Sequence, residues 1–444
     1  MNKELHHIRF DLARLVINKL PTLGDLIPVR TLQKQYDYHL ENQHSLPFYV
    51  IPQHAVEQVQ AQATDAHQMM IEALGRLFNE PEQITKYFDS QLLREHGRYF
   101  VPYAQHTFEA RGMIGQSLSG RFDMAYDPLT DQITGIYEFN GEVTGLLFES
   151  TSLQNDLVKQ ATGSTERQLN DWSQLIQNTL ASYNLNPDRR IAVVADLAYP
   201  EDLANAELIS QLFGQHVETH LRDLSEPPFF DLMNRSKPWA LMLSNEDENG
   251  ASVENWDVPV DAIYLDLTWD EIVDGSPEAF QQWQSWADNV AFIEPAWRWF
   301  MSHKGMMAYL THLLEVDHDY RERWGHVAII PTYLSPDRFL AERLPFVSKP
   351  TQGFQSSNVE IFDDSGSVAL STGGELFEMD RVYQAYRPAG SVEQGTVFTL
   401  GVWMASGNRS QTSDHPAYAS ALCIREVDAN LDVETERFVP HIIR

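Results

Sequence analysis

The residues best placed to do chemistry are an arginine, two carboxylates and an amide on two neighbouring strand-like segments. Arg121 and Asp123 lie on the first segment, and Glu138 and Asn140 lie on the second, with an Asp-Pro turn signal between them. Residues two apart on a strand point to one face, so pairing of the segments would bring the four side chains together. Oxygen ligands of this kind suit Mg²⁺, and a nearby guanidinium suits phosphate oxygens. An ordinary hairpin with a surface salt bridge is the alternative.

A second group of candidate residues lies near the other end of the chain. Lys304 lies at the start of an apolar helical segment, and Lys349 ends a short strand-like segment. The residues that follow, 351–359, form a loop of mostly small side chains. A lysine supplies a point charge and such a loop supplies backbone N–H groups, so together they predict a phosphate clamp.

These segments, in this order, resemble the glutathionylspermidine synthase family of ATP-grasp amide ligases. The resemblance runs from about Gly120 to the C-terminus. The metal-type carboxylates precede the phosphate-binding lysines, which is the permuted order of this family and differs from most ATP-grasp enzymes. The resemblance is densest in these segments: Arg121–Asp123, Glu138–Glu149, Glu294–Lys304, Phe346–Val359 and Ile424–His441.

The resemblance implies a metal site and two catalytic arginines. Asp123, Glu138 and Asn140 would hold Mg²⁺ against the phosphates of ATP. Arg121 would contact the transferred phosphoryl group, and Arg425 would stabilise the charge that develops at the acyl centre. The implied reaction joins a carboxylic acid to an amine through an acyl phosphate, with ATP converted to ADP and phosphate.

The resemblance also implies an ATP site. Lys304 and Lys349 would bind the phosphates, and Gln384 would lie near the adenine. A lid over residues 353–358 would close on the nucleotide. The lid residues expected to contact ATP are small or carry an amide: Gly353, Ser356, Ser357 and Asn358.

The amine substrate would face an acidic pair at the start of a helix, Glu201-Asp202. Taken alone, the pair favours a helix N-terminus, because carboxylates there favour the helix macrodipole. With the resemblance, the two interpretations have equal support. The stretch from residue 238 to 297 contains thirteen carboxylates and no lysine or arginine. The negative electrostatic potential of these carboxylates would attract a cationic amine such as a polyamine. The alternative is that they form an ordinary solvated acidic surface.

Two motifs depart from the family pattern. Residues 141–145 read Gly-Glu-Val-Thr-Gly where Ala-Asp-Thr-Pro-Thr is usual, and residues 353–359 read Gly-Phe-Gln-Ser-Ser-Asn-Val where Gly-Arg-Glu-Gly-Ala-Asn-Val is usual. These departures motivate a second hypothesis. The chain would then be a degenerate, non-catalytic protein of the same fold that binds ATP or a polyamine.

The composition of the chain argues against some classes of binding partner. The chain has 32 basic and 63 acidic residues, a formal net charge of −31, which argues against nucleic acid and anionic membranes. No apolar run is long enough to cross a bilayer, and the N-terminal residues lack the apolar core of a signal peptide. The single cysteine, Cys423, excludes an internal disulfide. We expect a cytoplasmic enzyme with a small-molecule acid and amine as partners; its oligomeric state is not indicated.

The chain of 444 residues exceeds one typical domain. Apolar periodicity predicts helices at residues 5–20 and 55–78, a βαβ-like unit from residue 190, and several strands after residue 304, including 327–330. With the resemblance, this pattern predicts a mixed α+β and α/β fold: a permuted ATP-grasp fold with a helical N-terminal region and an α/β substrate lobe. The expected divisions are a mainly helical region at 1–115, a metal and phosphate hairpin at 116–160, the substrate lobe at 161–300, and the ATP-grasp lid and C-terminal core at 301–444.

Overall fold

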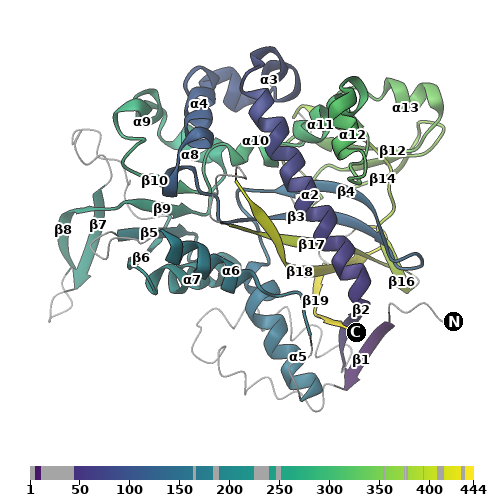
Figure 1. Ribbon diagram of the computed structural model, residues 1–444, viewed down its shortest axis with the longest axis horizontal. Coiled ribbons are helices and arrows are strands. Elements are labelled where there is room, and N and C mark those ends of the chain that lie inside the picture. The colour runs from purple at the N-terminus through teal and green to yellow at the C-terminus, as the bar shows by residue number, and fades with distance from the viewer. Residues whose placement is uncertain are drawn as a thin grey trace.

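The structure is a computed structural model that combines helices with several sheets. It describes residues 6–11, 45–163, 167–183, 190–224, 240–246, 252–353, 356–374, 376, 379–393, 395–407, 415–431 and 436–444. In Figure 1 a central sheet lies between a smaller sheet on the left and a group of helices and strands at the upper right. The mixture of helix and sheet confirms the predicted fold class.

The central sheet is antiparallel, with the strand order β19-β18-β17-β3-β4 and with β16 beside β17. The pair β3–β4 is the hairpin predicted from the carboxylate motif. The helix α2 (Gln53–Leu77) crosses this sheet in Figure 1 and contacts β4, β17 and β18. The strands of this sheet are β3 (Ser119–Asp127), β4 (Gln132–Asn140), β16 (Gly390–Glu393), β17 (Thr396–Ser406), β18 (Ala417–Asp428) and β19 (Arg437–Val439).

The second sheet is parallel and has the order β10-β9-β5-β6. The helix α7 (Pro200–Gly214) connects β5 to β6, which confirms the predicted βαβ unit. The residues of β5 are almost all buried, as expected for a strand covered on both faces. The strands are β5 (Arg190–Ala195), β6 (Glu218–Asp223), β9 (Ala262–Leu265) and β10 (Ala291–Ile293).

The third sheet has the order β11-β15-β12-β13-β14 and is antiparallel. It carries Lys349 on β12 and Gln384 on β15. The strand predicted at residues 327–330 is wrong: Ile329 makes only an isolated bridge to Ile136, and the strand β11 begins later. The strands are β11 (Thr332–Tyr333), β12 (Phe346–Pro350), β13 (Glu360–Phe362), β14 (Val368–Ser371) and β15 (Arg381–Ala385).

The N-terminal region is helical from α2 to α4 but begins with strands. Residues 6–11 form β1, so the helix predicted at residues 5–20 is wrong for them; residues 12–20 lie outside the described part of the chain. Pairing with β2 and, through it, with β20 near the C-terminus overrides the local helical periodicity. These strands are β1 (His6–Asp11), β2 (Ser45–Ile51) and β20 (His441–Ile443).

The remaining elements surround the sheets. A two-stranded hairpin joins β7 (Ala240–Glu246) to β8 (Ser252–Pro259). The remaining helices are α3 (Pro81–Tyr87), α4 (Gln91–Glu109), α5 (Gln154–Thr162), α6 (Trp172–Ser182), α8 (Trp269–Gly275), α9 (Pro277–Gln281), α10 (Arg298–Ser302), α11 (Gly305–Val316), α12 (His318–Trp324) and α13 (Asp337–Glu342). The short 3₁₀ and π turns are η3 (Gly112–Gly115), η4 (Glu149–Leu153) and η5 (Trp283–Ser285).

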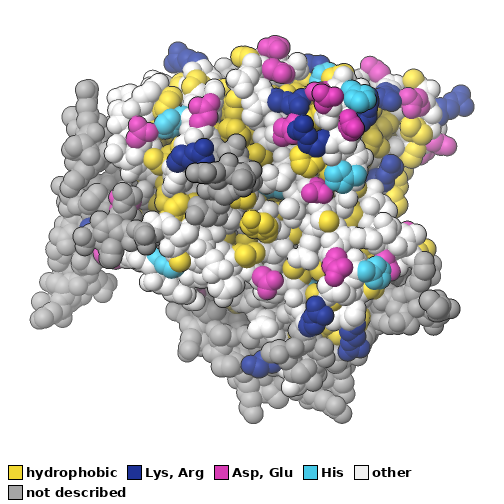
Figure 2. Space-filling view, in the orientation of Figure 1, with side chains coloured by type: hydrophobic (Ala, Val, Ile, Leu, Met, Phe, Trp, Pro, Cys, Tyr) yellow, Lys and Arg dark blue, Asp and Glu magenta, His cyan; other side chains and the backbone are white. Residues whose placement is uncertain are grey.

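The face of the molecule over α2 carries intermixed acidic and basic side chains, as Figure 2 shows. Ion pairs between elements include Arg76 with Asp317 and Arg323 with Glu72, each at 2.6 Å. Among the residues that the structure describes, no helix combines the length and the apolar character needed to cross a membrane.

A cluster of aromatic side chains packs α3, α4 and α10 together. Phe300 on α10 is fully buried and lies 5.3 Å, ring centre to ring centre, from both Phe78 and Phe88. It also contacts Phe100 on α4 and Trp299 beside it. Burial of so much aromatic surface stabilises the position of α10, which lies next to the candidate site described below.

We expect Phe300→Ala to lower the free energy of unfolding by about 3–5 kcal/mol, because it removes a buried ring and leaves a cavity. Chemical denaturation monitored by circular dichroism measures the change. Leu129→Ala is the control, since the Leu129 side chain is 75% exposed, and it should change stability by less than about 0.5 kcal/mol. Equal effects of the two substitutions would contradict the packing described for α10.

Candidate active site

A cavity of about 220 Å³ is lined by residues of the central sheet and of the five-stranded sheet. Its wall combines charged groups with apolar side chains such as Val347 and Ile361. This combination suits a ligand that has a charged part and an apolar ring. Nine residues predicted from the sequence line the cavity: Asp123, Glu138, Lys304, Lys349, Gly353, Ser356, Ser357, Gln384 and Arg425.

The β3–β4 register brings the predicted metal ligands together. Asp123 lies directly opposite Glu138, and Arg121 lies directly opposite Asn140. The Asn140 amide nitrogen donates to an Asp123 carboxylate oxygen over 3.3 Å. The convergence expected from the two-residue spacing is therefore present.

Asp123 is a buried carboxylate between two guanidinium groups. Arg121 Nε donates to one carboxylate oxygen over 2.9 Å, and Arg425 Nη2 donates to the other over 2.5 Å. Burial alone would raise the pKa of Asp123, but Arg121, Arg425 and the Asn140 amide hold it below its ordinary value. Asp123 therefore stays ionised and can act as an oxygen ligand for a cation.

Lys304 joins the predicted metal strand to the predicted lid. Its Nζ lies 3.4 Å from a Glu138 carboxylate oxygen and donates to the backbone oxygen of Gly353 over 2.8 Å. The backbone nitrogen of Lys304 also donates to the oxygen of Thr351. The lysine thus lies where β4, the start of α11 and the loop after β12 meet.

Lys349 and Gln384 form a second polar pair in the cavity wall. Lys349 Nζ donates to Gln384 Oε1 over 2.8 Å and lies 5.3 Å from the centre of the Tyr137 ring. The Gln384 amide nitrogen donates to the backbone oxygen of Tyr137, which attaches β15 to β4. Burial lowers the pKa of Lys349 to about 8, so the lysine is largely protonated at neutral pH.

Asn358 does not line the cavity. Its side chain is buried, accepts a hydrogen bond from the backbone nitrogen of Leu376 over 2.6 Å, and donates to the oxygen of Gly374. It therefore ties the predicted lid to the segment after β14. Gly353, Ser356 and Asn358 adopt φ angles of 138°, 55° and 52°. Residues 354 and 355 of the lid lie outside the described part of the chain.

Glu201, the first of the predicted amine-site pair, is linked to Arg121 through one peptide segment. Glu201 Oε1 accepts from the backbone nitrogen of Leu146 over 2.7 Å, and Arg121 Nη1 donates to the oxygen of Gly145 over 2.6 Å. A Cβ at Gly145 would lie 2.5 Å from the Glu201 carboxylate, so a side chain there would displace it. Glu201 and Asp202 are not among the residues that line the cavity.

An acidic group extends from this pair at the carboxyl ends of β5 and β9. It consists of Glu149, Glu201, Asp202 and Asp266. Burial raises the pKa of all four. Repulsion by Glu201 raises three of them further, to about 8 for Glu149, about 6 for Asp202 and about 7 for Asp266. Glu149 is 2% exposed, and its Oε2 has no hydrogen-bond partner among the described residues. A positive charge beside these groups would therefore be favourable.

Sequence reasoning missed Tyr137, Glu149 and Asp266. Tyr137 directly precedes Glu138, a predicted metal ligand. Its place in the cavity wall follows only from its contact with Gln384 on β15. Glu149 ends a segment in which the family resemblance is dense, so its presence there was a usable signal. Asp266 follows a buried parallel strand, and ligands of open parallel sheets bind at that edge.

The chain also matches a known family over most of its length. The match is to the family described as "Glutathionylspermidine synthase preATP-grasp", over residues 31–229 and 235–444. The chain belongs to this family. The resemblance read from the motifs is thereby confirmed, and membership places the chain among synthetases.

Two solved structures are similar to this chain at low sequence identity. A glutathione-synthetase-like effector, GSS30, of Globodera pallida in its apo form is 11% identical, with 89% of each chain covered and a TM-score of 0.51. A putative gamma-glutamylcysteine synthetase of Methylobacillus flagellatus KT is 12% identical, with 82% of this chain and 88% of that chain covered and a TM-score of 0.41. At 11% identity, the similarity to the Globodera pallida structure shows a shared fold and nothing more.

We expect Glu149→Gln to alter how stability depends on pH. The pKa of Glu149 is raised in the folded protein, so its contribution to stability is greatest below pH 4.5 and is lost as pH rises through about 8. The variant should therefore gain stability relative to the wild type between pH 5 and 8, by at most about 1.4 kcal/mol per pH unit. Thermal unfolding at several pH values measures this. A gain as small as that of Glu322→Gln, an exposed site, would contradict the assignment.

Proposed function

We propose that the protein is an ATP-dependent ligase that joins a carboxylic acid to an amine through an acyl phosphate. The observation that carries this proposal is the cavity in which Asp123 and Glu138 on one sheet face Lys304 and Lys349. Membership of a synthetase family supports it. Carboxylates beside lysines suit a metal-bound triphosphate, since each phosphate group needs cations around it.

The donor set fits Mg²⁺. Asp123 is held ionised, Glu138 lies opposite it, and Asn140 lies two residue pairs further along the hairpin. Mg²⁺ prefers a few hard oxygen ligands and leaves its other positions to water and phosphate oxygens. Bound there, the ion would neutralise phosphate charge during transfer.

The proposed reaction has two steps. An oxygen of the acid attacks the γ-phosphorus of ATP, and ADP leaves. The amine then attacks the acyl carbon of the resulting acyl phosphate, loses a proton, and phosphate leaves with the electron pair of the broken C–O bond. The first step is needed because the negative charge of a free carboxylate shields its carbon from an amine.

The chain's own residues would position the reactants and balance their charge. Lys304 and Lys349 would hold the phosphates, with Gln384 and the apolar wall beside the nucleotide base. Arg121 and Arg425 would stabilise the transferring phosphoryl group and the oxyanion at the acyl carbon. The loop that contains Gly353, Ser356 and Ser357 would exclude water from the acyl phosphate.

A cationic amine, polyamine-like in character, is the substrate that the acidic group supports best. Beyond the effect of burial, Glu201 lies close enough to Glu149, Asp202 and Asp266 to raise the pKa of each. An ammonium group among them would relieve that repulsion. The link from Glu201 through residues 145–146 to Arg121 puts this group next to the proposed phosphoryl-transfer site.

A non-catalytic, ATP- or polyamine-binding protein of the same fold is the second candidate. The changed motifs at residues 141–145 and 353–359 favour it. Mass spectrometry after incubation with ATP, Mg²⁺ and pooled acids and amines distinguishes the two. A new amide together with ADP supports the ligase, whereas ATP binding without phosphate release supports the second candidate.

We expect Asp123→Ala and Lys349→Ala each to abolish ATP turnover. The first removes a metal ligand and the second removes a phosphate cation, and loss of one such contact commonly costs about 100- to 1,000-fold in rate. The measurement is acid-dependent release of ADP. Lys86→Ala, an exposed site on α3, is the control and should keep full activity. Normal ADP release by either site variant would count against its assignment.

We expect Asp202→Asn to raise KM for the amine with little change in KM for the acid or for ATP. The substitution removes one charge from the acidic group and keeps the side chain's shape. In the wild type, KM for the amine should fall as pH rises from 6 to 8, because the pKa of Asp202 is about 6 and that of Asp266 about 7. Steady-state kinetics with each substrate varied in turn measures both effects. An unchanged amine KM in the variant would place the amine elsewhere.

A further inference from the structure

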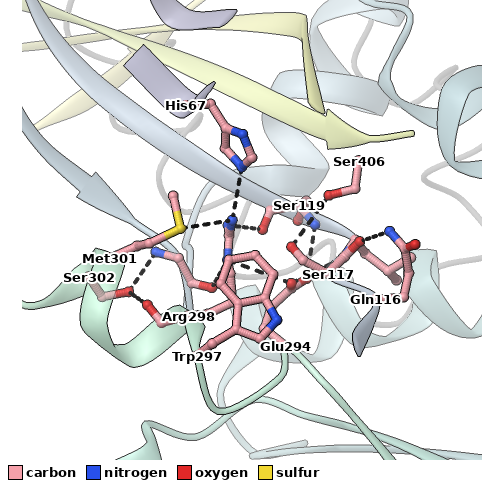
Figure 3. A network of polar contacts seen from close by, with 12 residues as sticks. His67, Gln116, Ser117, Ser119, Glu294, Trp297, Arg298, Met301, Ser302 and Ser406 are labelled. Atoms are coloured by element: carbon pink, nitrogen blue, oxygen red, sulfur yellow. Dashed lines mark hydrogen bonds and ion pairs between the residues drawn. The ribbon is translucent and has the colours of Figure 1, made fainter. Parts of the chain in front are cut away.

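Arg298 is a buried cation that has no part in the proposed chemistry. It is the first residue of α10 and is fully buried. Figure 3 shows its guanidinium at the centre of a polar network. Its Nε donates to the backbone oxygen of Gly141 over 3.1 Å, and its Nη2 donates to the backbone oxygen of Ser119.

The two acceptors belong to opposite strands of the metal hairpin. Ser119 begins β3, and Gly141 directly follows β4. The last pair in the β3–β4 ladder at this end is Arg121 with Asn140. The guanidinium therefore links the two strands by hydrogen bonds, just beyond the residues predicted to bind the metal and the phosphoryl group.

The sequence leaves space for this contact by placing glycine on both strands. A Cβ at Gly120 would lie 2.1 Å from Arg298 Nη2, and a Cβ at Gly141 would lie 3.2 Å from its Nε. Residues with side chains at these positions would push the guanidinium away from the strand ends. The close approach thus depends on both glycines.

Arg298 also supports the hairpin from behind. Its guanidinium lies 4.5 Å from the centre of the Phe139 ring, which in turn lies 4.5 Å from the Phe122 ring. Side chains alternate along a strand, so Phe139 points to the face opposite Glu138 and Asn140. The arginine therefore packs against the back of the strand that presents those ligands.

Neighbours of Arg298 hold the same strand ends. The Glu294 carboxylate accepts from the backbone nitrogens of Leu118 and Ser119 and lies 3.9 Å from Arg298 Nε. The Ser302 hydroxyl accepts from the backbone nitrogen of Gly141 over 2.9 Å. One segment, residues 294–302, therefore contacts both strands at the open end of the hairpin.

We propose that Arg298 is a positioning residue that sets the spacing of Asp123, Glu138 and Asn140 for the metal-bound nucleotide by closing the open end of the β3–β4 hairpin. The inference rests on the proposed function. A fully buried guanidinium whose carboxylate partner is 3.9 Å away costs free energy that apolar packing would not. The planar guanidinium, however, donates hydrogen bonds to two backbone carbonyls at once and so fixes the distance between the two strand ends.

The test is binding of Mn²⁺, as a probe of the Mg²⁺ site, to the full chain with a non-hydrolysable ATP analogue. The variant is Arg298→Lys, which keeps the charge but replaces the planar fork by one ammonium group. We expect Mn²⁺ affinity, measured by electron paramagnetic resonance, to fall about 10- to 100-fold, as for other residues that orient metal ligands. Affinity for the analogue without metal should stay the same, because Lys304 and Lys349 are untouched.

Arg76→Lys is the matched control. Arg76 also bridges two partners, Glu72 and Asp317, and lies 5.0 Å from the Tyr320 ring, but none of these residues lines the cavity. Mn²⁺ affinity should be unchanged in this variant. An equal loss in both variants, or no loss in Arg298→Lys, would overturn the proposal.

Ser302→Ala decides the question if Arg298→Lys does not fold. It removes the hydrogen bond to Gly141 and leaves Arg298 in place. A smaller loss of Mn²⁺ affinity in the same direction supports the proposal, and an unchanged affinity overturns it. Failure of the wild type to bind Mn²⁺ with the analogue would overturn the proposed function, and this inference with it.

Discussion

The candidate active site depends on the register between β3 and β4. Asp123 lies opposite Glu138 and Arg121 opposite Asn140 only in this register. A slip of one residue would turn these side chains to the other face, because side chains alternate along a strand. Phe122 and Phe139 are buried on that other face, so exposing them in the cavity would also cost hydrophobic free energy. The same register therefore buries the phenylalanines on one face of the hairpin and brings the predicted ligands together on the other.

Charge divides the site into two halves. Around Asp123 the cationic groups of Arg121, Arg425, Lys304 and Lys349 gather, which suits a triphosphate with its metal. Around Glu149, burial and then repulsion between neighbouring carboxylates raise the pKa values, which suits a cation. The peptide segment contacted by both Arg121 and Glu201 joins the halves. A ligase that brings an anionic acyl donor to a cationic amine needs this arrangement.

The fold class could be predicted from local pattern together with the family resemblance, and the hairpin face of the candidate site from spacing alone. The long-range pairings could not be predicted. The spacing of Arg121, Asp123, Glu138 and Asn140 gave a hairpin face, because a period of two is a local property. The helix predicted over residues 6–11 failed because β1 forms only by pairing with β2. Arg298 lies in a segment of dense family resemblance, but its role could not be predicted, since it depends on two backbone carbonyls more than 150 residues away. The place of Asn358 within the lid likewise follows only from its contacts with Gly374 and Leu376.

The central claim is that residues far apart in the chain form one cage for a metal-bound triphosphate. A crystal structure with Mg²⁺ and a non-hydrolysable ATP analogue tests it most directly. We expect the ion between Asp123 and Glu138, with the phosphates within hydrogen-bonding distance of Lys304 and Lys349. A nucleotide bound outside the cavity, or phosphates that contact neither lysine, would contradict the claim.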